Sequence, residues 1–152
     1  MSRSTLSIDE EADRNVSERL GAVVRIMMGT NRRVFNVDEL RRFVFPAVVL
    51  GQLKIHYSLR NEPVGYATWA YLSPRAASRI RTEGDPELHF SEWNEGLELW
   101  IMDFCSLKGY ASAFAKELRE TVFPERKDAF AYIPSGRANA GKVLKFTHRD
   151  RS

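Results

Sequence analysis

One carboxylate in the sequence stands out as a group that could carry acid–base chemistry. Asp103 follows the apolar residues Trp100, Ile101 and Met102 and precedes Phe104, near the end of a predicted buried strand. A carboxylate among such neighbours has to be ion-paired or hydrogen-bonded. Asp103 could therefore act as a general base or orient one. The alternative is a structural aspartate that binds loop N–H groups.

The turn that follows this strand is the second candidate, because it could bind an anion. The free N–H groups and the dipole at the start of a helix attract negative charge, and small side chains let a ligand approach the backbone. Such a turn suits the phosphate arm of a pantetheine carrier, although an ordinary strand–loop–helix connection has the same pattern. The residues that would bind this donor are Gly109, Tyr110, Ala111 and Ser112.

The remaining reactive side chains give weaker signals. His56 lies on the polar face of a predicted strand, where a solvated histidine is expected. The spacing of His56, His89 and His148 fits no metal site, so we expect no bound metal. Cys105 is the single cysteine, which excludes an internal disulfide and a cysteine-based zinc cluster. We expect it to be a packed residue rather than a nucleophile.

Length and charge narrow the class of protein. The 152 residues suit one domain, and the net charge of +3 is unevenly distributed. Residues 25–60 hold seven basic and two acidic groups, whereas residues 61–104 hold three basic and eight acidic groups. The basic part would attract phosphate or an acidic protein. Nucleic acid is disfavoured, because aromatic residues do not alternate with the basic ones. No apolar run reaches the roughly 20 residues of a membrane span, and we expect a cytoplasmic protein.

The hydrophobic periodicity predicts the elements that position these residues. A helix is expected from about Ala12 to Gly29, and a second one with Asp38 as N-cap, reaching Pro46. The later elements are strands 52–58 and 64–72, helix 74–82, strand 97–104, helix 109–122, and strands 128–133 and 142–146. This order predicts an α+β domain with a mixed β-sheet flanked by helices. We place it at residues 12–148, between a flexible segment 1–11 and a tail 149–152.

Six short stretches, in this order and at this spacing, resemble the RTX toxin-activating lysine acyltransferases, the HlyC-type proteins. They are LGAVVRIMM at 20–28, FPAV at 45–48, EPVGYATWAYLS at 62–73, LWIMDF at 99–104, FPE at 123–125 and GKVLKF at 141–146. The resemblance implies a GNAT-like three-layer fold with no bound cofactor. It also implies transfer of a fatty acyl group from the phosphopantetheine thioester of acyl carrier protein to internal lysines of a protoxin, in the cytoplasm.

The same resemblance implies roles for the candidate residues. Asp103 falls on the essential aspartate of the family, and the Gly109 turn falls where a GNAT-like fold holds the pantetheine. The basic residues of 25–60 would suit the acidic carrier protein. The family's catalytic histidine is absent, because Arg32 or Arg33 occupies its place. Arginine stays protonated and cannot act as a base, although it could hold a carbonyl or a phosphate.

Three hypotheses follow from this replacement. The chain could be a lysine acyltransferase in which Asp103 or a water is the base and Arg32 or Arg33 orients the donor. It could instead acylate another amine, such as that of a small precursor peptide. In the third hypothesis it binds acyl carrier protein without catalysis. His56 or His148 could reach the site from another strand, and a homodimer is left open.

Overall fold

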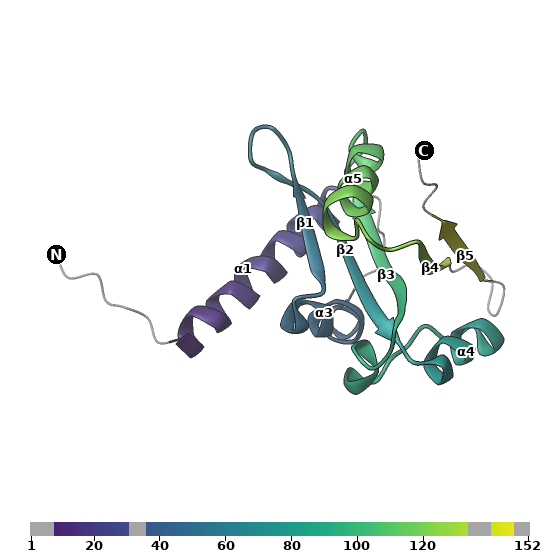
Figure 1. The fold of residues 1–152 in the computed structure, drawn as a ribbon. Helices are drawn as coiled ribbons and strands as arrows, with labels where there is room; N and C mark the ends of the chain where they lie inside the picture. Colours follow the sequence, from purple (N-terminus) through teal and green to yellow (C-terminus); the bar gives the residue numbers. More distant parts are fainter. Residues whose placement is uncertain (1–7, 31–35, 134–140, 148–152) are drawn as a thin grey trace.

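The computed structural model describes residues 8–30, 36–133 and 141–147, with side chains described from residue 14 onward (Figure 1). The longer elements are α1 (Ile8–Met28), α2 (Val37–Glu39), α3 (Phe45–Leu50), β1 (Leu53–Tyr57), β2 (Pro63–Leu72), α4 (Pro74–Glu83), β3 (Glu98–Ser106), α5 (Ala111–Glu117), β4 (Asp128–Ile133) and β5 (Lys142–Thr147). Their order confirms the predicted α+β class and the predicted succession of helices and strands.

Local capping explains where the helices start and end. The Ser73 hydroxyl accepts the Ala76 N–H at 3.2 Å, and α4 ends at Gly84, both as the sequence predicts. The prediction of Asp38 as an N-cap was wrong. Asn36 caps α2 by accepting the Glu39 N–H at 2.9 Å, while the Glu39 carboxylate accepts the Asn36 N–H at 3.1 Å. This reciprocal capping box moves the helix start two residues earlier.

Two π-helical turns lie directly before the two Phe-Pro pairs of the chain. They span Leu40–Val44, before Phe45-Pro46, and Leu118–Val122, before Phe123-Pro124. In each turn the phenylalanine N–H donates to the carbonyl five residues earlier. Because proline has no N–H and restricts the residue before it, a regular helix cannot continue unchanged there. The first π turn packs against β3, the strand that carries Asp103.

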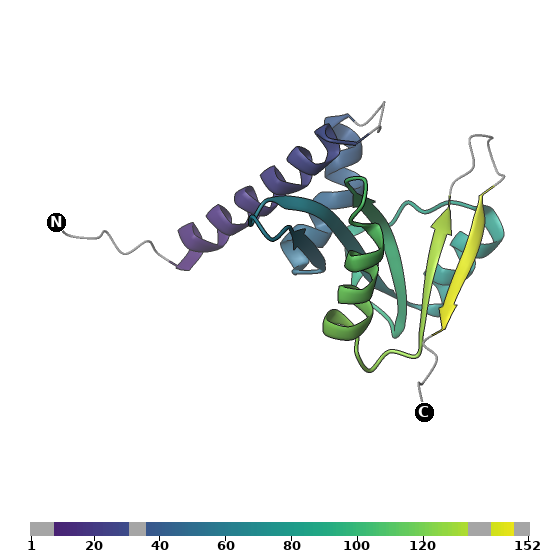
Figure 2. The ribbon, with the colours of Figure 1, turned by 90° about the horizontal axis from the view of Figure 1, so that it is seen from above.

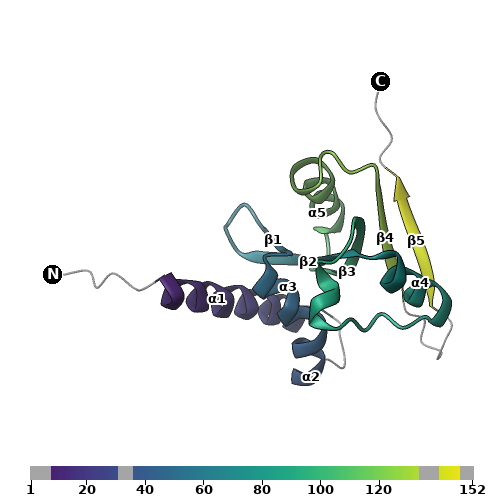
Figure 3. The same ribbon diagram turned by 60° about the horizontal axis from the view of Figure 1, so that its bottom comes forward.

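The five strands form one mixed sheet in the order β1-β2-β3-β4-β5. Neighbouring strands are antiparallel except β3 and β4, which are parallel and are joined through α5 (Figures 1 and 2). Figure 3 shows α5 on one side of the sheet and α1 and α3 on the other. We call these sides the α5 face and the α1 face. The sheet is therefore flanked by helices on both sides, as predicted.

Three clusters of buried side chains hold the layers together. On the α1 face, Tyr66 packs with Val23, Ile26 and Val48 of α1 and α3. Further along the same face, Trp100 packs among residues of α3, α4 and the short 3-10 helix Phe90–Trp93. The α5 face has a smaller cluster of Ala67, Phe114 and Leu118. None of the described helices has the length and apolar character needed to span a bilayer.

Candidate active site

A β-bulge in β3 determines which way Asp103 points. Thr68 of β2 pairs with Asp103, but the next residue, Trp69, pairs with Ile101, so Met102 is an extra residue in β3. Side chains of a strand alternate between faces, and one extra residue reverses that alternation. Asp103 therefore lies on the α1 face, on the same side as Trp100. Without the bulge it would share the α5 face with Ile101.

Asp103 is held by a tyrosine from the neighbouring strand. The Tyr66 hydroxyl donates a hydrogen bond to Asp103 Oδ2 at 2.6 Å. Tyr66 is fully buried, whereas Asp103 is only partly buried. This bond fixes one carboxylate oxygen from beneath and leaves the group within reach of solvent. Asp103 lies three residues before the end of β3 rather than at its end, because Cys105 and Ser106 still pair with β2.

The connection that follows α1 begins beside Cys105 of β3. Cys105 lies two residues after Asp103 on the same face, and its Sγ lies 3.9 Å from Oγ1 of Thr30, the residue at the start of that connection. Cys105 is buried and takes part in no disulfide, which agrees with the expectation of a packed cysteine. Arg32 and Arg33 lie in the following segment, outside the described residues, as does His148.

The turn after β3 has the geometry expected of a strand-to-helix connection. Gly109 has φ +93°, a left-handed conformation that side chains disfavour, and Tyr110 is the N-cap of α5 without a side-chain capping bond. Ala111 and Ser112 are exposed in the first turn. The first N–H groups of α5 therefore lack a side-chain cap at an accessible surface.

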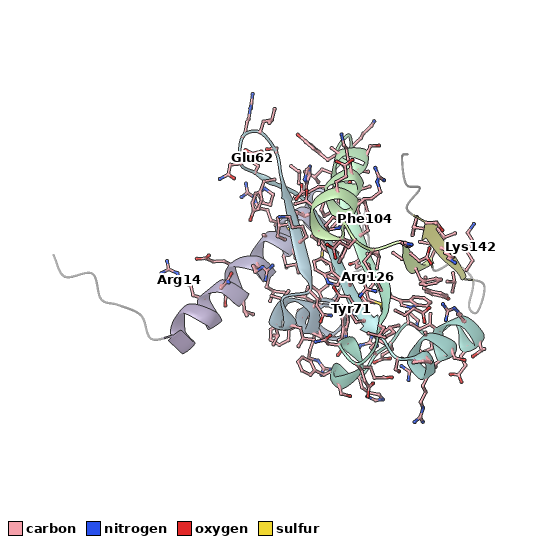
Figure 4. The ribbon with its side chains drawn as sticks, in the orientation of Figure 1. Arg14, Glu62, Tyr71, Phe104, Arg126 and Lys142 are labelled. Atoms are coloured by element: carbon pink, nitrogen blue, oxygen red, sulfur yellow. The ribbon has the colours of Figure 1, made fainter. Side chains whose placement is uncertain are left out.

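Parallel pairing of β3 and β4 is short. Only Trp100 with Phe130 and Ile101 with Ala131 are paired, although β3 continues to Ser106. From Asp103 onward β3 pairs with β2 alone, which leaves its other backbone edge without a partner strand. Phe104 lies on this stretch, 37% exposed and stacked on Phe114 of α5 (Figure 4). This edge runs from the Asp103 carboxylate to the Gly109 turn.

His56 lies on the opposite face of the sheet from Asp103. It is paired in register with Gly65, packs 5.1 Å from the Phe114 ring, and places Nδ1 2.5 Å from Glu117 Oε2. Its side chain is 13% exposed, so the expectation of a solvated histidine was wrong. The alternation of polar and apolar residues in β1 marked His56 as outward-facing, but α5 covers that face as well. His56 does not join the Asp103 site.

Three of the described basic residues of 25–60 are paired with acidic side chains. Arg41 and Arg42 bind Asp38, and Arg42 also lies 3.2 Å from Glu87. The hydrogen bond from Arg41 is the main cause that lowers the pKa of Asp38 below its usual range. Lys54 lies 3.4 Å from Glu117, on the other side of the molecule. These acidic neighbours neutralise part of the positive charge that the sequence concentrates there.

Two open cavities among the described residues lie away from Asp103. One, of about 380 Å³, lies between the end of α4 and the residues Tyr132 and Val143 of β4 and β5. The other, of about 290 Å³, lies between α1 and β1, next to Arg19 and Lys54. Neither is lined by the Gly109 turn.

Comparison with known proteins identifies the family of the chain. Residues 12–147 match the model of the HlyC RTX toxin acyltransferase family. The chain therefore belongs to this acyltransferase family.

Three relatives match the chain at modest identity, and two of them are named as lysine acyltransferases. An uncharacterized protein of Synechocystis sp., sll0720, is 26% identical over 124 residues, 80% of this chain and 81% of the relative. The lysine-acyltransferase RtxC of Vibrio cholerae is 23% identical over 110 residues, 71% of each chain. The RTX-II toxin-activating lysine-acyltransferase ApxIIC of Actinobacillus pleuropneumoniae is 26% identical over 112 residues, 74% of this chain and 68% of the relative.

Sequence reasoning chose Asp103 as a candidate but did not consider the tyrosine that binds it in the structure. Tyr66 was part of the resemblance to the family and was not considered as a site residue. The bulge at Met102 could not be predicted from the sequence, because Met102 lies in a run of apolar residues.

Proposed function

We propose that this acyltransferase moves a fatty acyl group from the phosphopantetheine thioester of acyl carrier protein to an amine, the side chain of a lysine in a protein acceptor. The observation that carries the proposal is the placement of Asp103. It lies on the stretch of β3 that pairs with β2 but not with β4 and that leads to the Gly109 turn, and the bulge turns it toward the α1 face. The names of RtxC and ApxIIC support a lysine acceptor.

The donor would bind along the edge of β3 in a GNAT-like manner. Backbone N–H and C=O groups from Asp103 to Ser106 have no strand partner on the β4 side, so the amides of a pantetheine arm can take that place. Its phosphate would bind the N–H groups of Ala111 and Ser112 beyond Gly109.

Three exposed cations near this turn suit an acidic carrier protein. Lys108 precedes Gly109, and Lys116 and Arg119 follow on α5 and its continuation. Within the described part of the chain none of these three is ion-paired. Positive charge around the donor turn steers an acidic partner toward it and speeds encounter. This surface is a better docking site than the neutralised cations Arg41 and Arg42.

The reaction requires one acyl transfer and one proton transfer. The neutral amine nitrogen attacks the thioester carbonyl carbon and forms a C–N bond, giving a tetrahedral intermediate. Asp103 takes a proton from that nitrogen, the C–S bond breaks, and the carrier thiolate takes up the proton. The products are an amide and the free carrier thiol. Arg32 or Arg33 would stabilise the negative oxygen of the intermediate or hold the donor phosphate.

Mass spectrometry of an acceptor tests the proposal directly. The purified chain is incubated with acyl carrier protein loaded with acyl groups of several lengths, and with an RTX-type protein as the candidate acceptor. We expect an acyl adduct on internal lysines and release of one carrier thiol for each adduct. An adduct only on a short peptide amine would replace the lysine acceptor by the second hypothesis. Binding of the carrier without transfer or hydrolysis would contradict acyl transfer.

An isosteric substitution tests the role of Asp103. Asp103→Asn keeps the shape and removes the charge, and the rate of transfer should fall about 100-fold or more, the usual contribution of a general base. The matched control is Asp128→Asn, because Asp128 is an exposed strand aspartate paired with Lys145 at 3.7 Å. The control should transfer at the wild-type rate. Equal rates for both variants would remove Asp103 from the mechanism.

Restoring a histidine tests the departure from the family. Arg32→His and Arg33→His are made separately, and an increase in the transfer rate is expected from the one that recreates the family's base. If neither variant changes the rate, the loop position does not limit catalysis, and Asp103 is sufficient as the base.

A further inference from the structure

A buried hydroxyl beside Asp103 makes no hydrogen bond. Thr68 is 0% exposed, and its Oγ1 has no hydrogen-bond partner among the groups that the structure describes. It lies on the α1 face, between Tyr66 and Ala70 of β2, where the two large clusters of that face meet. Buried hydroxyls without a partner destabilise a fold and are rare in proteins. An unpaired hydroxyl at this position therefore needs an explanation.

The register places this hydroxyl next to the catalytic carboxylate. Thr68 and Asp103 are directly opposite in the antiparallel pair of β2 and β3, at the edge of the bulge. Side chains in that relation have Cβ atoms about 5 Å apart, so a small movement of the Thr68 side chain brings its hydroxyl within hydrogen-bond distance of the carboxyl group. Tyr66 already donates to Oδ2. Thr68 is the second hydroxyl that β2 presents to Asp103.

We propose that Thr68 is a positioning residue whose hydroxyl binds the Asp103 carboxyl group in the reacting state. The inference rests on the proposed function. When Asp103 takes the proton from the attacking nitrogen, an N–H bond breaks and an O–H bond forms on the carboxyl group. The new O–H is a donor that needs an acceptor, and Thr68 Oγ1 has two free lone pairs. The bond ends when the proton moves on to the carrier thiolate.

This arrangement explains why the hydroxyl is unpaired at rest. An interaction that forms only after proton transfer stabilises the transition state and leaves the substrate complex unchanged, which raises kcat rather than affinity. A purely structural hydroxyl would instead be bonded in the resting structure. The two roles predict opposite effects on stability when the hydroxyl is removed.

Three variants separate the roles. Thr68→Val removes the hydroxyl at nearly constant shape, Thr68→Ser keeps it, and Thr147→Val makes the same change on the exposed end of β5. For Thr68→Val we expect kcat to fall about 10-fold, the loss of one hydrogen bond in the transition state, with KM unchanged. Its melting temperature should equal or exceed that of the wild type. Thr68→Ser and Thr147→Val should keep the wild-type kcat.

Three other results would overturn the inference. A clearly lower melting temperature of Thr68→Val would show that the hydroxyl is bonded at rest and would overturn the inference. Unchanged kcat of Thr68→Val, in an assay where Asp103→Asn is inactive, would overturn it as well and leave the proposed function intact. A wild-type chain that transfers no acyl group would contradict the proposed function, and the inference with it.

Discussion

Polar side chains on the two faces of the central sheet differ in their bonding and exposure. On the α5 face, Glu117 binds both His56 and Lys54, and the imidazole is covered by the Phe114 ring. On the α1 face, the partly exposed Asp103 accepts a hydrogen bond from Tyr66, while the buried hydroxyl of Thr68 has no partner among the described groups.

This difference separates groups that hold the fold from groups that are available for chemistry. Fully satisfied polar networks stabilise and fix a structure, whereas partly satisfied ones lose stability. Proteins keep such unsatisfied groups mainly where a substrate or a reacting state will use them. A histidine on the α5 face is therefore structural despite its residue type, and a threonine on the α1 face is a candidate for function.

Closing the space under the Phe114 ring should give the largest loss of stability. A Cβ on Gly65 would lie 3.0 Å from the Phe114 ring, and 3.3 Å from both the Cys105 carbonyl oxygen and Ser106 Cβ. Gly65→Ala should lower the free energy of unfolding by about 2 kcal/mol in urea denaturation, because overpacked sites strain their neighbours.

A glycine-to-alanine substitution in α1 should change the free energy of unfolding in the opposite direction. Nothing lies within 4 Å of a Cβ at Gly21, which is exposed on α1. Gly21→Ala should raise the free energy of unfolding by about 0.5–1 kcal/mol, since alanine favours helix. Equal effects of the two substitutions would contradict the tight packing of the α5 face.

Removing the charge that holds His56 should have the next largest effect. Glu117→Gln weakens a partly buried pair and should lower the free energy of unfolding by about 1.5 kcal/mol, typical of a hydrogen bond to a charged group. The matched control is Glu120→Gln, an exposed acid in the next turn with no pairing partner among the described residues. If the two variants are equally stable, His56 and Glu117 do not hold α5 to β1.

Unfolding of the protein at low pH should depend on a carboxylate that is paired with an arginine, away from Asp103. Arg79 donates to both oxygens of Glu92 at 3.0 Å, and this bond is the main cause that holds the pKa of Glu92 below its ordinary value of 4.5. The pair therefore stabilises the fold above that value, and the stability is lost as the pH falls through the lowered pKa. Glu92→Gln should lose about 1 kcal/mol at pH 7 and show a weaker acid dependence in thermal melts. An unchanged acid dependence would contradict this role.

Lys54, the exposed partner of Glu117 on the α5 face, should contribute least to the stability of the fold. The Lys54 side chain is 40% exposed. Lys54→Met should change the free energy of unfolding by less than about 0.5 kcal/mol, as is usual for surface ion pairs. A loss as large as that of Glu117→Gln would show that the lysine, rather than the histidine, is the main partner of Glu117.

Sequence patterns predicted the elements well where a local rule decides them. The alternation in β1, the Ser73-Pro74 helix start and the Gly84 helix end follow from neighbouring residues, and the structure confirms all three. Asp103 was also chosen as a candidate from local sequence, because a carboxylate in an apolar strand is conspicuous.

Other features depend on pairing between distant parts of the chain. The bulge at Met102 exists only relative to the register of β2, and the bond from Tyr66 to Asp103 crosses 37 positions of sequence. His56 was misassigned because periodicity shows which side of a strand is polar, but not that a later helix covers that side.

The central claim is that chemistry belongs to the α1 face and stability to the α5 face. The most direct measurement is the single-turnover rate of acyl transfer, from loaded carrier protein to acceptor, by Asp103→Asn and Glu117→Gln side by side, with a thermal melt of each. We predict that Asp103→Asn loses about 100-fold in rate and Glu117→Gln less than about twofold. The melts should rank the variants in reverse. A slow Glu117→Gln beside an active Asp103→Asn would contradict the account.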